Sequence, residues 1–268
     1  MSEELVGLVP AAGKGVRLGL PYPKELYPVI RDKHYKPIAQ FVVENLTLCG
    51  VSDIVFVINE TKHQLVGYFG SGRRFGCNFS YVVQESRGSE GASTSPGLAH
   101  ALDSAYHLAR GKTVLFGMAD TIMEPPDVFA HLLNAARPED QVVLGLFGVS
   151  RPGGFGMVQM ADDASVLKIV DKPASSQLRL AWGCMVWRPD FTEYLHYSVN
   201  NERTSDFAEV MNNAMVEGIR FRGCALEDGR YFDLGTYEEI VELEAVQAGR
   251  GVLTSSQARA GEIQGMES

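Results

Sequence analysis

The first part of the chain alternates short apolar runs with helix-length amphipathic stretches, from Glu4 to about Val149. This alternation is the rhythm of an α/β sheet. The apolar runs are short and rich in Val and Ile, as in strands buried on both faces. Strands are predicted at Leu5–Pro10, Asp53–Ile58, Phe79–Gln84, Thr113–Met118 and Gln141–Val149. Helices are predicted between them at Pro37–Cys49, Thr61–Phe69, Gly97–Ala109 and Pro126–Ala136.

The rhythm changes after Ser150, where a turn at Arg151–Gly154 leads into short strands with little helix between them. These strands are Gly156–Met160, Val166–Val170 and Ala181–Trp187. The rest of the chain is predicted to form helices at Asp190–Val199 and Asp206–Glu217, strands at Ile219–Ala225 and Arg230–Phe232, and a helix from Thr236. We therefore predict a core over residues 1–150, a lid over residues 151–249 that completes the same domain, and a flexible tail over residues 250–268.

Two tryptophans lie in the last of the lid strands. Trp182 and Trp187 are five positions apart, so regular alternation predicts that they face opposite sides of the sheet.

Charge and composition exclude several classes of protein. The 268-residue chain is 45% hydrophobic and 21% charged, which is ordinary for a soluble globular protein. Its net charge of −9 disfavours sequence-independent binding to nucleic acid or anionic lipid. It has no apolar run of about 18 residues that could span a bilayer, and its N-terminus carries acids where a signal peptide has bases. We expect a cytoplasmic protein without nucleic-acid or membrane partners.

A glycine-containing loop follows the first predicted strand, within Leu8–Lys24. Such a loop lets backbone N–H groups approach a phosphate closely, and nearby cations compensate its charge. The spacing Gly13-x-Gly15-x-x-Leu18 lacks the third glycine of a dinucleotide-binding loop, and the P-loop pattern is also absent.

The segment Ala11-Ala12-Gly13-Lys14-Gly15-Val16-Arg17, followed by Pro23-Lys24, resembles the sugar-1-phosphate nucleotidylyltransferases. The likeness runs from Leu5 to about Gly249. It implies a Rossmann-like α/β nucleotidyltransferase fold, with a mostly parallel mixed sheet flanked by helices and a small sugar-binding subdomain. It also implies a Mg²⁺-dependent reaction of an NTP with a sugar-1-phosphate that yields an NDP-sugar and pyrophosphate. Members are often dimers or tetramers, so a homo-oligomer is an open expectation.

The resemblance assigns several residues to the nucleotide. The loop residues Ala11, Ala12, Gly13 and Gly15 would contact the NTP, Arg17 the leaving pyrophosphate and Lys24 the α-phosphate. Gln84 would pair with a pyrimidine base, and the backbone of Gly97 would contact the same base, with Gly91 as a rival for that role. The Ser- and Gly-rich loop Glu85–Pro96 lies between them.

Two aspartates match the metal ligands of these enzymes. Asp120 follows an apolar strand, and the carboxyl ends of strands are where open α/β sheets bind ligands. Asp233 lies in the segment Arg230–Thr236. Two carboxylates suit Mg²⁺, which keeps other positions for phosphate oxygens. Each could instead be a turn or capping residue.

Further matches fall in the predicted lid. Gly156, Asp171, Gly183 and Asp206 would bind the sugar, and Lys172 would hold the attacking phosphate as a compact point charge. Gly156 and Gly183 would leave room for the hexose ring. Asp171 and Asp206 stand where relatives often have Glu, so the identity of the acceptor stays open.

Three alternatives remain beside this interpretation. Gln84 favours UTP or dTTP, but the short interval from Arg17 to Lys24 also fits a cytidylyltransferase acting on a polyol phosphate or phosphonate. A non-catalytic, nucleotide-sugar-binding regulatory protein would be expected to lack Asp120, Asp233 or Lys24. An NAD-dependent enzyme is disfavoured by the missing glycine.

Overall fold

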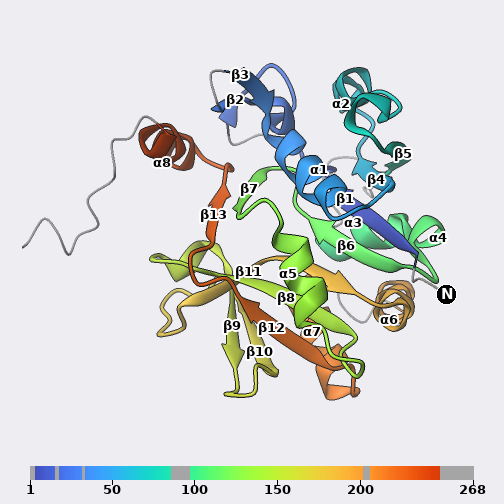
Figure 1. The fold of residues 1–268 in the computed structure, drawn as a ribbon, viewed down its shortest axis with the longest axis vertical. Helices are drawn as coiled ribbons and strands as arrows, with labels where there is room; N and C mark the ends of the chain where they lie inside the picture. The colour runs from blue at the N-terminus through green and yellow to red at the C-terminus, as the bar shows by residue number, and fades with distance from the viewer. Residues whose placement is uncertain (1–3, 16–17, 32–33, 86–96, 202–205, 248–268) are drawn as a thin grey trace, which may run out of the picture.

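A mixed nine-stranded sheet forms the centre of the molecule, with helices on both of its faces (Figure 1). The computed structural model describes residues 4–15, 18–31, 34–85, 97–201 and 206–247. The strands of the sheet are β1 (Leu5–Pro10), β4 (Asp53–Ile58), β5 (Asn78–Val83), β6 (Thr113–Gly117), β8 (Val142–Gly148), β9 (Gly156–Met160), β10 (Val166–Asp171), β11 (Leu180–Trp187) and β12 (Phe221–Ala225). Their order is β10-β9-β11-β6-β1-β4-β5, and β8 pairs with both β11 and β12.

Pairing is parallel in one half of the sheet and mixed in the other half, where β12 is parallel to β8. β1 is parallel to β4 and β6, and β4 is parallel to β5. β11 is antiparallel to β6, β8 and β9, and β10 is antiparallel to β9. Because β1, β4 and β6 end at the same edge, the loops that follow them meet there, at the usual ligand-binding edge of such a sheet.

The helices bury their apolar sides in two clusters, one on each face. One cluster joins the sheet to α1 (Ile38–Leu48), α2 (His63–Phe69) and α5 (Val128–Ala135). The other joins it to α3 (Leu98–Ser104), α4 (Tyr106–Ala109), α6 (Pro189–Asn200) and α7 (Phe207–Val216).

Two strand glycines let α1 approach the sheet closely. A Cβ atom on Gly7 of β1 would lie 2.9 Å from Leu46 Cδ1, and one on Gly117 of β6 would lie 2.6 Å from Val42 Cγ2. Leu46 and Val42 both belong to α1. The close crossing of α1 therefore fixes the two strands whose following loops carry the conspicuous sequence motifs.

A third, smaller apolar cluster lies under α8 (Tyr237–Gln247), with side chains from β2, α1, β7 and α8. β2 (Pro28–Arg31) and β3 (His34–Pro37) form a hairpin, and β7 (Thr121–Glu124) pairs antiparallel with β13 (Arg230–Asp233). Short 3-10 helices η2 (Lys24–Leu26), η3 (Arg73–Phe75) and η4 (Pro152–Gly154) complete the described elements. The β7–β13 pair brings the end of the chain back to the segment that follows β6.

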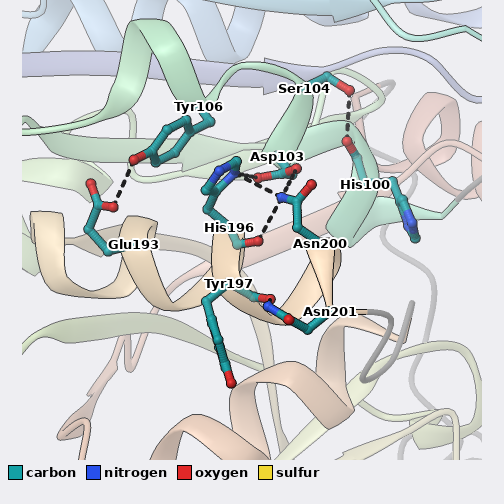
Figure 2. A network of polar contacts seen from close by, with 9 residues as sticks. All are labelled: His100, Asp103, Ser104, Tyr106, Glu193, His196, Tyr197, Asn200 and Asn201. Atoms are coloured by element: carbon teal, nitrogen blue, oxygen red, sulfur yellow. Dashed lines mark hydrogen bonds and ion pairs between the residues drawn. The ribbon is translucent and has the colours of Figure 1, made fainter.

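A polar network ties α3 and α4 to α6 (Figure 2). His196 Nδ1 lies 2.8 Å from Asp103 Oδ1, and the His196 ring stacks on Tyr106 with centroids 3.7 Å apart. Tyr106 donates its hydroxyl proton to Glu193 at 2.8 Å, and Asn200 donates to the His196 carbonyl at 2.8 Å. The network fixes the position of α3, whose first residue follows Gly97.

The fold class is confirmed, and the predicted strands appear with ends shifted by at most two residues. The helix predicted at Gly97–Ala109 is divided into α3 and α4. The sequence missed the β2–β3 hairpin and β7, which are four residues long and show little alternation. The expected core and lid share one sheet, and their functional division stays a prediction.

The prediction that the two tryptophans face opposite sides is wrong. Both rings lie against Phe116, with centroids 6.2 Å away for Trp182 and 5.9 Å for Trp187. The pairing of β11 with β8 shifts register between Trp182 and Cys184, and such a bulge resets the alternation of side chains. The bulge therefore returns Trp182 to the face that buries Trp187.

All four cysteines are free thiols, in agreement with their scattered spacing. Within the described ranges, no helix is both long enough and apolar enough for a transmembrane span.

The side chain of Asn212 in α7 makes two hydrogen bonds to the backbone of β10, which is an edge strand of the sheet. Its side chain accepts from Ile169 N–H at 2.9 Å and donates to Ile169 C=O at 2.8 Å. Asn212→Ala would leave both groups without this partner, and we expect a loss of about 1–3 kcal/mol in the free energy of unfolding. Urea denaturation measures this loss. Asn213→Ala, the adjacent position on α7, is the matched control, and an equal loss in both variants would contradict the assignment.

Candidate functional site

Two hydrogen bonds hold the first residues of the loop that follows β1. Ala11 donates its N–H to the Val57 carbonyl at 2.7 Å, and the Ala12 carbonyl accepts from Asn59 Nδ2 at 2.8 Å. Ala11 and Ala12 are buried, whereas Gly13 is exposed. β4 and the residue following it thus hold the start of the loop, and Asn59 is a positioning residue that the sequence analysis missed.

A pocket of about 410 Å³ opens beside this loop. Gly15, at φ +63°, lies against the aliphatic stem of Lys24, because a Cβ atom on Gly15 would be 3.6 Å from Lys24 Cγ. Three lysines line the pocket, namely Lys14, Lys24 and Lys62. A pocket with this lining can bind an anionic group such as a phosphate chain.

Lys24 meets Asp120 and lies within the field of Asp233. It donates to Asp120 Oδ2, and the two side chains are 12% and 14% exposed. Burial lowers the pKa of Lys24, but the carboxylates of Asp120, Glu25 and Asp233 outweigh it and raise the pKa above its usual value. Lys24 therefore stays charged at neutral pH.

Asp120 and Asp233 are far apart in sequence but adjacent in space. Asp233 is opposite Thr121 in the β13–β7 pair, and Leu234 N–H donates to the Asp120 carbonyl at 3.1 Å. Tyr231 lies beside them with its pKa raised well above the usual value, mainly by burial and further by the two aspartates. The structure thus brings together the two acids predicted from separate motifs.

Their chemistry fits a hard divalent cation. Both offer carboxylate oxygens, which Mg²⁺ prefers, and Mg²⁺ is usually held by one or two carboxylates together with substrate phosphates. In the part of the chain that the structure describes, no group of three or more His, Cys, Asp or Glu residues could hold a metal ion. Two carboxylates would leave a Mg²⁺ ion at Asp120 and Asp233 with other coordination positions for substrate oxygens.

A second ion pair, which the sequence analysis also missed, joins Lys62 to Glu25. The atoms Lys62 Nζ and Glu25 Oε1 are 2.5 Å apart, and the side chains are 3% and 2% exposed. Burial lowers the pKa of Lys62 and raises that of Glu25. The sequence signal that could have identified Lys62 is its position, because Lys62 follows β4 at the same sheet edge at which Asp120 follows β6.

A pocket of about 280 Å³ gathers most of the residues predicted to bind the acceptor. Asp171, Lys172 and Asp206 contribute charges to its lining, together with Asp233. Leu98, Met118, Gly154, Phe155, Gly156, Trp182, Phe207, Ala208 and Tyr231 complete the lining.

Two charged residues of this lining, Lys172 and Asp206, have backbone or capping contacts that fix their positions. Lys172 has φ +40°, and its N–H donates to the Phe155 carbonyl at 3.0 Å. Positive φ is uncommon for a residue other than glycine and concentrates at functional sites. Asp206 caps α7 by accepting from Ala208 N–H at 2.8 Å and Glu209 N–H at 3.2 Å. This contact gives Asp206 a structural role beside its predicted one.

Gly156 and Gly183 have a packing role beside the predicted one. A Cβ atom on Gly156 would lie 2.2 Å from Trp182 Nε1, and one on Gly183 would lie 2.4 Å from Tyr231 Cε2. Each glycine therefore makes room for an aromatic ring of the chain itself. That Gly156 and Gly183 contribute to acceptor binding stays a prediction.

The two predicted base contacts occupy the ends of a connection whose residues 86–96 are outside the described ranges. Gln84 is 6% exposed, and its buried Nε2 has no hydrogen-bond partner among the described residues. Gly97 has φ +91° and precedes α3. An orphaned buried amide donor is unfavourable unless a ligand or water completes it.

The predicted pyrophosphate contact, Arg17, lies outside the described residues, as do Gly91 and the whole of the predicted tail, residues 250–268.

A family model described as "Nucleotidyl transferase" matches residues 6–248. A glucose-1-phosphate thymidylyltransferase from Streptomyces griseus is 29% identical over 65% of this chain and 46% of its own length. A second protein of that name, from Streptomyces antibioticus, is 24% identical over 88% of this chain and 64% of its own length. The chain thus spans about half to two thirds of the length of these curated relatives.

A solved structure of UDP-glucose pyrophosphorylase complexed with UDP-glucose superposes with a TM-score of 0.74 at 22% identity, covering 91% of this chain and 98% of that one. This likeness supports the fold.

The Tyr231–Gly183 contact predicts a packing defect on substitution. Gly183→Ala would place a methyl group inside the Tyr231 ring, and we expect a loss of about 1–3 kcal/mol in stability from overpacking. Gly148→Ala is the control, because nothing lies within 4 Å of its Cβ position. Chemical denaturation of both variants measures the difference, and a Gly183→Ala protein as stable as Gly148→Ala would contradict the contact.

Proposed function

We propose, since the chain belongs to the nucleotidyl transferase family, that it transfers a nucleotidyl group from an NTP to a sugar-1-phosphate and releases pyrophosphate. The observation that carries the proposal is the position of Lys24, Asp120 and Asp233. Lys24 lines the cationic pocket, Asp233 lines the acceptor pocket, and Asp120 pairs with Lys24. A nucleotide in the first pocket and an acceptor in the second would therefore meet at these three side chains.

The proposed reaction is an in-line displacement. A phosphate oxygen of the acceptor attacks the α-phosphorus of the NTP, the new P–O bond forms as the bond to the bridging oxygen breaks, and pyrophosphate leaves with those electrons. Catalysis of this kind depends on positioning and on neutralising charge. Lys24 would stabilise the charge that develops at the α-phosphate, and Lys172 would hold the attacking phosphate. Arg17 is assigned to the pyrophosphate by the sequence resemblance.

Asp120 and Asp233 are the residues that would hold Mg²⁺. When bound, the ion supplies charge neutralisation on the phosphate oxygens. Lys24 already neutralises Asp120 in this structure, and its raised pKa keeps that charge in place. Ala12, Gly13 and Gly15 would place backbone N–H groups near the phosphates. The N–H of Ala11 is already bonded to the Val57 carbonyl, so Ala11 would contribute by positioning the loop.

We favour UTP or dTTP as the nucleotide. The orphaned Nε2 of Gln84 supports a pyrimidine base, since a buried amide can donate to the carbonyl edge of such a base. The names of the thymidylyltransferase relatives and of the UDP-glucose pyrophosphorylase neighbour favour thymine or uracil among the pyrimidines. The same names support a hexose-1-phosphate as the acceptor.

A second candidate is a cytidylyltransferase that acts on a polyol phosphate or phosphonate. It is favoured by one observation, which is that Trp182 and Tyr231 fill the space above Gly156 and Gly183. Both rings line the acceptor pocket, and an extended polyol chain is narrower than a hexose ring.

Pyrophosphate release tests the proposal. The assay crosses UTP, dTTP, CTP, ATP and GTP with several sugar-1-phosphates and a polyol phosphate, with and without Mg²⁺. Metal-dependent release with UTP or dTTP and a sugar-1-phosphate is expected. Release with CTP and the polyol phosphate would instead establish the second candidate, and silence with every pair would favour the non-catalytic binding protein.

Loss of either of two charged side chains, Lys24 or Asp233, should strongly reduce turnover. Lys24→Met and Asp233→Asn are each expected to lower turnover by about 10²–10³, the usual effect of removing one preorganised charge from such a site. Lys112→Met is the control, because Lys112 pairs with Glu4, which immediately precedes β1 at the end of that strand opposite its glycine loop. Steady-state kinetics on the folded variants measures turnover. Near-normal turnover in either variant would overturn the role proposed for the residue that it replaces.

A further inference from the structure

The proposed reaction leaves one buried ion pair without a role. Lys62 and Glu25 have lost almost all contact with solvent, at 3% and 2% exposure. Removing two charges from water is costly, and such a pair is weak evidence for stabilisation by itself. A buried lysine beside a cationic pocket therefore calls for a functional account.

The bonding of this pair differs from that of the structural ion pair in the molecule, Arg222–Asp140. There, Asp140 Oδ2 accepts from Arg222 Nε at 2.5 Å and from Arg137 N–H at 2.9 Å, and Arg222 also donates to the Asp163 carbonyl at 2.9 Å. In the Lys62–Glu25 pair, Glu25 Oε2 is buried with no hydrogen-bond partner among the described residues. The pair is thus incompletely bonded, unlike one built only to join two elements.

Lys62 also lies in the wall of the pocket beside the loop after β1. It lines the 410 Å³ pocket together with Lys14, Gly15 and Lys24, and it comes from a different element, the start of α2. An ammonium group carries three N–H donors, so Lys62 can keep one on Glu25 and still donate to another oxygen. Glu25 immediately follows Lys24, so the pair fixes Lys62 next to the residue assigned to the α-phosphate.

We propose that Lys62 is a phosphate-binding residue of the nucleotide site, and that Glu25 holds its ammonium group at the pocket wall. This inference rests on the proposed function and extends it. Lys62 approaches the phosphate chain from the β4 edge, while Lys24 approaches from the loop after β1. Glu25 is a positioning residue, because it acts through Lys62.

Binding of inorganic pyrophosphate to the full chain, measured by calorimetry, tests the proposal without requiring turnover. Lys62→Met is expected to weaken pyrophosphate binding by about tenfold or more, as for loss of a charged hydrogen bond. Lys62→Arg should retain most of the affinity. Glu25→Gln keeps an acceptor for Lys62 but removes the negative charge that offsets the burial of its ammonium group, so its affinity should fall less than that of Lys62→Met.

The control is Lys112→Met. Lys112 pairs with Glu4 at 2.7 Å, and Glu4 immediately precedes β1, at the end of that strand opposite its glycine loop. Thermal melting of every variant checks folding. In the double variant Lys62→Met, Glu25→Gln, stability should recover because no buried charge is left alone, whereas pyrophosphate binding should stay weak.

A purely structural pair gives a different pattern. Recovery of affinity in the double variant, an equal loss in Glu25→Gln and Lys62→Met, or a change of less than about twofold in Lys62→Met would each overturn the proposal. Absence of pyrophosphate binding in the unmodified protein would overturn it as well. Lys62-dependent pyrophosphate binding in a protein that releases no pyrophosphate from any NTP would instead sustain the role of Lys62 and refute the proposed reaction.

Discussion

The contact between Lys24 and Asp120 is the interaction on which the rest of the site depends. It joins the loop after β1 to the segment after β6, and the β7–β13 pair places Asp233 beside both. These segments can meet because β1 and β6 are parallel neighbours that end at the same edge. The close crossing of α1 over Gly7 and Gly117 fixes those two strands. Backbone packing therefore determines where three charges from distant parts of the sequence lie.

Aromatic packing determines the shape of the second pocket. Trp182 lies over Gly156 and Tyr231 lies over Gly183, so each glycine is required by a ring of the chain itself. Tyr231 also lies 5.3 Å from the ring of Phe147 and 6.0 Å from that of Phe155. Because Tyr231 is two residues before Asp233, this packing also fixes the carboxylate. The shape of the second pocket and the position of Asp233, the proposed metal ligand, are thus coupled through one side chain.

Sequence patterns were sufficient for the fold class and for the motifs that carry charge. Continuous apolar runs such as Leu5–Pro10 are constrained by burial on both faces, which leaves a clear pattern. The resemblance identified Lys24, Asp120 and Asp233 as candidate site residues from the sequence alone. The family assignment is confirmed by the match over residues 6–248. The individual site roles stay predictions.

What the sequence could not give depends on contacts between distant residues. The bulge beside Trp182 is set by pairing with β8, so alternation alone placed that ring on the wrong face. Lys62 and Glu25 are 37 positions apart and carry no joint motif. β7 is stabilised by its pairing with β13, which lies more than a hundred residues further along the chain. These features arise from tertiary packing, which overrides local preference.

In the proposed reaction, the group transferred is the nucleotidyl unit, which is carried to a phosphate of the acceptor. The most direct measurement follows radiolabel from UTP or dTTP into products with the sugar-1-phosphate and Mg²⁺. Label from the α-phosphate is expected in the sugar product, and label from the γ-phosphate is expected in pyrophosphate. Label from the γ-phosphate in the sugar product, or bound nucleotide with no label transferred to any acceptor, would contradict it.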